Sequence, residues 1–145
     1  MKIGVCCGTD VEKIKYIKAL GYDYAESHCQ EIAKADDAKI EAMLATGLPV
    51  IAANCFISLP VVGEEKDEAA IKEYLETLFS KAKRLGLEYL VFGSSAARRI
   101  PDGMSLEQGR GEIVDFLKNL VVPVAEKYNI PVAIEPLRPE ECNAI

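Results

Sequence analysis

Four short junctions between a helix end and a strand start recur along this chain, and they constrain its fold more than any other feature. Glycine or asparagine ends each predicted helix, because both residues tolerate the left-handed conformation found at helix C-termini. A strand-like run follows within one or two residues, and proline at some junctions prevents the helix from continuing. The junctions are Gly21-Tyr22-Asp23, Gly47-Leu48-Pro49, Gly86-Leu87-Glu88 and Asn129-Ile130-Pro131. This regular alternation predicts parallel strands joined by right-handed helical crossovers.

The spacing of apolar residues places the predicted elements between these junctions. A capping box from Thr9 to Glu12 is expected to open the first helix, and one from Ser105 to Gln108 the last. Pro123 should kink the last helix or mark its final turns. The strands are predicted at residues 2–8, 22–29, 49–57, 88–93 and 131–137, and the helices at residues 9–21, 36–47, 68–85 and 105–129, with long loops at residues 58–67 and 94–104.

Two architectures fit this pattern, a doubly wound sheet and part of an eight-stranded βα barrel. Strands of a doubly wound sheet are covered by helices on both faces and should be almost continuously apolar. Here polar residues gather at the carboxyl ends of the strands, as they do at the mouth of a barrel. They are Glu26, His28, Asn54, Ser94, Ser95 and Glu135. We therefore predict an α/β fold, a parallel (βα)4β5 partial TIM barrel that is open rather than closed, in a single domain over residues 1–145.

The last predicted strand, residues 131–137, carries a carboxylate, Glu135, near its end. The pattern indicates a short buried strand in which Glu135 points away from the side of Val132 and Ile134. A carboxylate in a dry interior is strongly disfavoured unless a cation, a metal or a hydrogen-bond donor lies opposite. Glu135 is therefore the first candidate for a functional residue.

The other polar strand ends leave alternatives open. Glu26 and His28 either line a substrate pocket or are ordinary rim residues. Asn54 either contacts substrate or caps the adjacent loop. Arg98 and Arg99 are expected to form salt bridges with the acidic helices rather than to clamp an anion.

Charge and composition exclude several classes of protein. The chain has 17 basic and 23 acidic side chains and a net charge of −6, which disfavours nucleic acid as a partner. No apolar run is long enough to span a membrane, and the first residues lead directly into a strand, so a cytoplasmic location is expected. Five cysteines form no CxxC pair and are expected to be small buried hydrophobes, and a single histidine, His28, excludes a histidine-rich zinc site.

Four segments together resemble the xylose isomerase-like barrel family of sugar phosphate isomerases and epimerases. They are Lys2-Ile-Gly-Val-Cys6, Ala53-Asn-Cys-Phe56, the stretch Val91-Phe-Gly-Ser-Ser-Ala-Ala-Arg-Arg-Ile-Pro-Asp-Gly103, and Ala133-Ile-Glu-Pro-Leu137. The resemblance covers the whole chain but only about the first half of that family's barrel.

The resemblance implies metal-assisted isomerisation or epimerisation of a small sugar or sugar phosphate. A divalent cation (Mn, Mg, Co or Zn) would stabilise an enediolate while carboxylates move the proton. In the family, the glutamate matched by Glu135 is both a metal ligand and a catalytic acid/base, and the one matched by Glu141 contacts substrate. The other three metal ligands, an aspartate, a histidine and a second glutamate, come from later strands. The chain alone is therefore expected to be incomplete and inactive.

Two further expectations follow from the open ring. Its apolar inner face and unpaired strand edge favour self-association as a homodimer or higher oligomer. A non-catalytic half-barrel that binds a ligand, or that pairs with itself or with a separate C-terminal half, is the alternative function. An apurinic-site endonuclease-like role is disfavoured by the negative charge and by the lack of a histidine-rich strand pattern.

Overall fold

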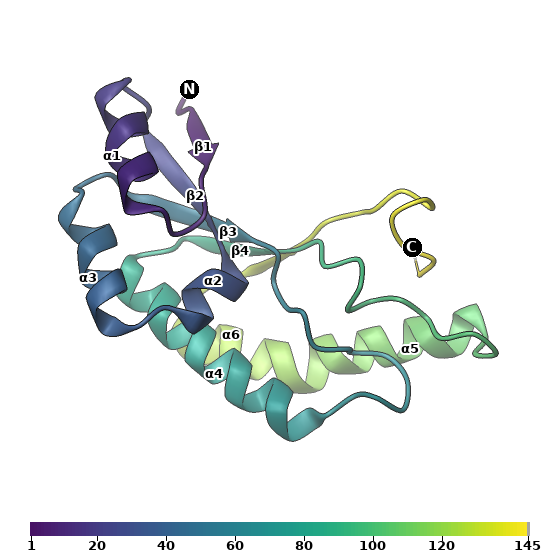
Figure 1. Ribbon diagram of the computed structural model, residues 1–145. Helices are drawn as coiled ribbons and strands as arrows, with labels where there is room; N and C mark the ends of the chain where they lie inside the picture. The colour runs from purple at the N-terminus through teal and green to yellow at the C-terminus, as the bar shows by residue number, and fades with distance from the viewer. Residues whose placement is uncertain (145) are drawn as a thin grey trace.

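Five parallel strands form one sheet in the computed structural model, which describes residues 1–144 (Figure 1). The strands are β1 (Gly4–Cys6), β2 (Tyr24–His28), β3 (Val50–Asn54), β4 (Tyr89–Phe92) and β5 (Val132–Ile134). Each strand pairs with the one before it in the sequence, in the order β1-β2-β3-β4-β5. This sequential order is that of a barrel wall, and the sheet does not close on itself. The predicted open (βα)4β5 partial barrel is confirmed.

The connecting helices gather on one side of the sheet (Figure 1). They are α1 (Val11–Ala19), α2 (Cys29–Lys34), α3 (Asp37–Ala45), α4 (Glu68–Leu85), α5 (Leu106–Phe116), the π-helix η1 (Leu117–Val121) and α6 (Val122–Tyr128). Neighbouring helices pack on one another as a single layer, from α1 through α3 and α4 to α6. The other face of the sheet carries no helix among the described residues. It is the concave face that a complete barrel encloses.

Aromatic side chains fill the core between the sheet and the helix layer. Phe56 lies at the centre, with its ring centroid 6.2 Å from that of Phe79 and 5.5 Å from that of Phe92. Phe92 in turn contacts Phe116 of α5 at 5.6 Å. All four rings are buried. Burial of this cluster ties β4 to the helices on both sides of it.

Local signals set several helix ends as expected. Helix α4 covers the predicted residues 68–85 and ends at Gly86, whose φ of 79° is the left-handed conformation that glycine adopts readily. Ser105 and Gln108 form the predicted capping box of α5. Pro123 follows the π-helix, because proline has no N–H for a regular helical bond to Asn119 and the turn before it widens.

Three local predictions were wrong. Asp10, not Thr9, caps α1 and accepts bonds from the amides of Glu12 and Lys13. The predicted second strand ends at His28, and the missed helix α2 starts at Cys29. The last strand is not buried: Ile134 lies on the helix side yet is 46% exposed, because β5 is the sheet edge and no later helix among the described residues covers it.

Candidate active site at the carboxyl ends of the strands

The strand register brings polar side chains together on the concave face. Cys6 lies beside Glu26, and His28 lies beside Asn54. Because side chains alternate across a strand, Glu26 and His28 point to the same face. Val91 pairs with Ala133, so Glu135 follows on that face from the far edge of the sheet. Four of the five candidate residues therefore gather at one end of the sheet.

Glu26 and Glu135 both lie on the concave face, and the charge of Glu135 acts on Glu26. Burial raises the pKa of Glu26, and the charge of Glu135 adds to the rise. His28 and a hydrogen bond from Asn54 favour the charged form and offset this only in part. A half-buried carboxyl group that holds its proton more tightly than usual is suited to proton exchange with a bound substrate.

Because the pKa of Glu26 is raised, replacing this residue by glutamine should stabilise the fold, and the gain should depend on pH. A carboxyl whose pKa is higher in the folded protein stabilises the fold while protonated, and this contribution is lost as pH rises through the folded pKa. Glu26→Gln, which is always neutral, should therefore unfold at a higher urea concentration than wild type at pH 7, and the gap should close towards pH 4. Glu88→Gln, which changes an exposed carboxylate just before β4, is the control. A gap that widens on acidification would contradict the prediction.

His28 is held by a carboxylate that the sequence analysis missed. Nδ1 of His28 lies 2.8 Å from Oε1 of Glu31, in the first turn of α2. Oε2 of Glu31 accepts the Thr9 amide at 2.8 Å and the Thr9 hydroxyl at 2.9 Å. These bonds lower the pKa of Glu31, although burial works against its charge. The one available signal was the spacing of three residues after a strand end, which places Glu31 beside His28 once α2 forms.

Two groups contact the thiol of Cys6. Nε2 of His28 lies 3.4 Å from Sγ, and Nδ2 of Asn54 donates to Sγ at 3.5 Å. Cys6 and Cys55 are exposed, Cys7 is half-buried, and only Cys29 and Cys142 are buried. The expectation that the cysteines are buried hydrophobes is therefore wrong for Cys6 and Cys55. Cys6 lies on the concave face, and Cys55 follows β3 in a left-handed conformation with φ 52°.

Gly93 and Arg98 set the position of Glu135. A Cβ at residue 93 would overlap Oε2 of Glu135, so a side chain there would push this carboxylate out of its present position. Arg98 is fully buried, its guanidinium lies 4.8 Å above the centroid of Phe92, and it donates to the Glu135 carbonyl at 3.1 and 3.2 Å. The expected salt bridge of Arg98 with the acidic helices is wrong, because packing on Phe92 takes the side chain into the core.

Glu141 makes its contacts away from the other candidate site residues. It is exposed in the segment after β5 and forms a salt bridge with Arg138 at 3.1 Å. Hydrogen bonds from Arg138 lower the pKa of Glu141. Within residues 1–144, Glu141 thus pairs with a neighbour in the chain rather than with a strand-end side chain.

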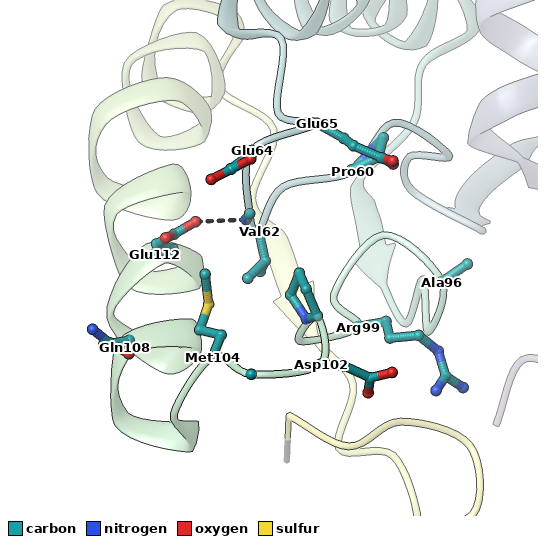
Figure 2. Close-up of a pocket in the computed structure, with 13 residues that line it drawn as sticks. Pro60, Val62, Glu64, Glu65, Ala96, Arg99, Asp102, Met104, Gln108 and Glu112 are labelled. Carbon is teal, nitrogen blue, oxygen red and sulfur yellow. Dashed lines mark hydrogen bonds between the residues drawn. The ribbon is translucent and has the colours of Figure 1, made fainter.

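A large hollow lies between two long loops and α5 (Figure 2). It measures about 790 Å³ and is lined by Glu64 and Glu65 of the first loop and by Arg99 and Asp102 of the second. Glu112 of α5 accepts the Gly63 amide at 2.8 Å and fixes the first loop against the helix. The strand-end residues Glu26, His28, Asn54 and Glu135 do not line this hollow.

The described residues offer part of a metal site at most. No group of three or more His, Cys, Asp or Glu among residues 1–144 is arranged to hold a metal ion. Glu26 and Glu135 provide oxygen ligands of the kind that hard divalent cations prefer. Oδ1 of Asn54 is buried without a hydrogen-bond partner in the described structure. These groups do not make a complete coordination shell.

Comparison with known proteins decides the family. The model of the xylose isomerase-like TIM barrel family matches residues 14–145. The chain belongs to this family. The match includes β2 to β5. It therefore covers the strand-end residues Glu26, His28, Asn54 and Glu135 but not Cys6. A search of curated proteins found no match.

Several solved structures share the fold over nearly the whole chain. The apo 3-keto-D-glucoside 4-epimerase YcjR from E. coli has 24% identity and a TM-score of 0.73, covering 95% of this chain and 57% of its own. D-psicose 3-epimerase with D-tagatose from Clostridium cellulolyticum H10 has 15% identity and a TM-score of 0.80, covering 100% and 55%. An IolI protein with a bound zinc atom has 21% identity and a TM-score of 0.60, covering 92% and 51%.

This chain therefore spans about half the length of these structural neighbours. The recognised family and the open five-stranded sheet agree with each other, since half of an eight-stranded barrel leaves its concave face uncovered. No helix within the described residues is long and apolar enough to cross a membrane.

Proposed function

We propose that this chain forms the first half of the sugar-binding ring of a metal-dependent isomerase or epimerase. The observation that carries the proposal is the placement of Glu135 with Glu26 on the concave face, at the carboxyl ends of parallel strands, where barrel enzymes bind substrate. Family membership and the similarity to two epimerases support the same class of reaction. The remaining strands of the ring supply the other walls of the site.

Glu135 takes the proton from the carbon next to the sugar carbonyl and also binds the metal. Glu135 is exposed on the concave face, and Gly93 leaves room for its carboxylate there. A bound divalent cation would stabilise the negative charge that develops on the sugar oxygens. Glu26, His28 and Asn54 bind the sugar hydroxyls, because together they offer both donors and acceptors. Glu141 contacts the substrate once the ring is complete.

The charge of the cluster favours a neutral sugar over a sugar phosphate. Glu26, Glu31 and Glu135 place negative charge around the strand ends. Burial raises the pKa of the Cys55 thiol, and the charges of these three carboxylates raise it further. The fully buried Arg98 donates to the protein backbone and has no free face for a phosphate. Phosphate binding at this cluster would therefore require cations from outside the described residues.

The metal claim can be tested on the chain as it is. Mn²⁺ at millimolar concentration should broaden the amide NMR signals of Gly93 and Glu135, because paramagnetic relaxation detects weak sites that two carboxylates provide. Glu135→Gln should abolish the broadening, whereas Glu88→Gln, an exposed carboxylate before β4, should leave it unchanged. Equal broadening in wild type and Glu135→Gln would remove Glu135 from the metal site.

A non-catalytic assembly module is the second candidate, and the uncovered face favours it. Tyr89 of the concave face is 36% exposed, and Ile3 and Ile134 at the two sheet edges are 52% and 46% exposed. Burial of such surface drives association. We expect the chain to self-associate at micromolar concentration, which sedimentation velocity measures. A single monomeric boundary over that range would count against assembly through the open side.

A further inference from the structure

Cys6, His28 and Glu31 form a chain of hydrogen-bonding groups of the kind that activates a thiol. Glu31 lies 2.8 Å from Nδ1 of His28, and this carboxylate favours the neutral tautomer with its proton on Nδ1, in which Nε2 is an acceptor. Nε2 lies 3.4 Å from the exposed Sγ of Cys6. A nucleophile, a base beside it and a third group that orients the base are the elements of thiol catalysis.

Asn54 and Thr9 add further hydrogen bonds to this chain of groups. Asn54 donates to the same Sγ at 3.5 Å, which stabilises a thiolate more than a thiol. Thr9 donates both its amide and its hydroxyl to Glu31, so the orienting carboxylate is itself fixed. The groups converging on Cys6 thus come from β2, β3, α2 and the turn after β1.

We propose that Cys6 is a nucleophilic thiol that exchanges with small cationic disulfides. The proton of the Cys6 thiol passes to Nε2 of His28, and the thiolate attacks one sulfur of the disulfide. That S–S bond breaks as the bond to Cys6 forms, and the departing thiolate takes the proton from His28. Cys6 is oxidised to a mixed disulfide while the other half of the reagent is reduced to a thiol.

Charge around the thiol selects the reagent. Glu26 of β2 lies beside Cys6 in the strand register, and Glu31 of α2 contacts His28. The charges of Glu135, Glu31 and Glu26 also act on the nearby thiol of Cys55. A cationic disulfide is attracted by these carboxylates and an anionic one is repelled. The mixed disulfide would place a cationic group at the strand ends and block sugar entry. This consequence rests on the proposed function, whereas the thiol exchange itself does not.

Cys55 is a reference thiol within the same chain. It is exposed like Cys6, and burial together with the charges of Cys6, Glu135, Glu31 and Glu26 raises its pKa. The hydrogen bonds of His28 go to Cys6 and Glu31 instead. Since an unassisted thiol is only a few per cent ionised near pH 7, Cys6 should react roughly tenfold faster than Cys55.

The test is thiolation of the chain by cystamine at pH 7, followed by peptide mass spectrometry. Cys6 should be modified roughly tenfold faster than Cys55, and faster by cystamine than by the anionic dithiodipropionate. His28→Gln keeps a donor beside Sγ but accepts no proton, and it should reduce the Cys6 rate to that of Cys55. Equal rates at Cys6 and Cys55, or a Cys6 rate unchanged in His28→Gln, would overturn the proposal; equal rates with the two reagents would overturn the cationic preference.

Two further measurements keep the test decisive. Cys29 is fully buried, so its modification in a variant marks that variant as unfolded. Glu31→Gln keeps the imidazole and removes its charged anchor, and it should lower the Cys6 rate by a smaller factor than His28→Gln. If His28→Gln unfolds, an unchanged Cys6 rate in Glu31→Gln overturns the proposal. No sugar or metal is present in these assays, so their failure is distinct from failure of the proposed function.

Discussion

Replacing Glu135 by glutamine should lower the rate of sugar proton exchange by about 10²–10⁴-fold in a ring completed with the second half of a related barrel. Glutamine keeps the size of the side chain and the room that Gly93 leaves for it. It can neither accept the proton from carbon nor bind a cation with a charged oxygen. The loss should therefore appear in turnover, with little change in folding.

The measurement is incorporation of deuterium from D2O into a ketose, followed by NMR. The ring is made by joining this chain to the second half of D-psicose 3-epimerase, whose fold this chain matches with a TM-score of 0.80. Glu88→Gln in the same ring removes an exposed carboxylate just before β4 and should exchange at the unchanged rate. Full exchange in Glu135→Gln would show that another residue moves the proton.

Replacing Phe92 by alanine should lower the free energy of unfolding by about 3–5 kcal/mol. Phe92 is fully buried, and its ring lies between those of Phe56 and Phe116 at 5.5 and 5.6 Å. It also supports the guanidinium of Arg98 at 4.8 Å, so its loss leaves a buried cation beside a cavity. Both effects act in the same direction.

Urea unfolding followed by circular dichroism measures this change. Val114→Ala on α5 is the matched control, because Val114 is 45% exposed and its truncation leaves no cavity. We expect the control to change the unfolding free energy by less than about 0.5 kcal/mol. A loss below about 1 kcal/mol for Phe92→Ala would show that the aromatic cluster relaxes around the missing ring.

The candidate site was predictable in its strand-end residues and not in the groups that hold them. Glu26 and His28 were placed on one face by the two-residue period of a strand, and the register then brought Asn54 beside them. Glu31 was missed because α2 is only six residues long and starts directly after β2, where no apolar period announces a helix. Unless α2 is predicted, the sequence does not indicate that a carboxylate lies beside Nδ1 of His28.

The N-cap of α1 was predicted wrongly for the same reason, because it depends on a contact with the missed helix α2. Thr9 and Asp10 are both good N-cap residues, and local propensity does not separate them. Thr9 is used by Glu31 of α2, which accepts both its amide and its hydroxyl, and Asp10 is left to cap the helix. A contact between residues 22 positions apart therefore decides a helix boundary.

The sequence by itself determined the alternation of strands and helices, the stops at Gly86 and Asn129, and the capping box at Ser105, because neighbouring residues alone decide these features. Only the tertiary structure decided that Arg98 is buried against Phe92, that Ile134 is exposed, and that Cys6 meets a histidine anchored by Glu31. The physical reason is that burial and pairing depend on which distant surfaces meet, and here one face of the sheet meets the helices while the other faces solvent.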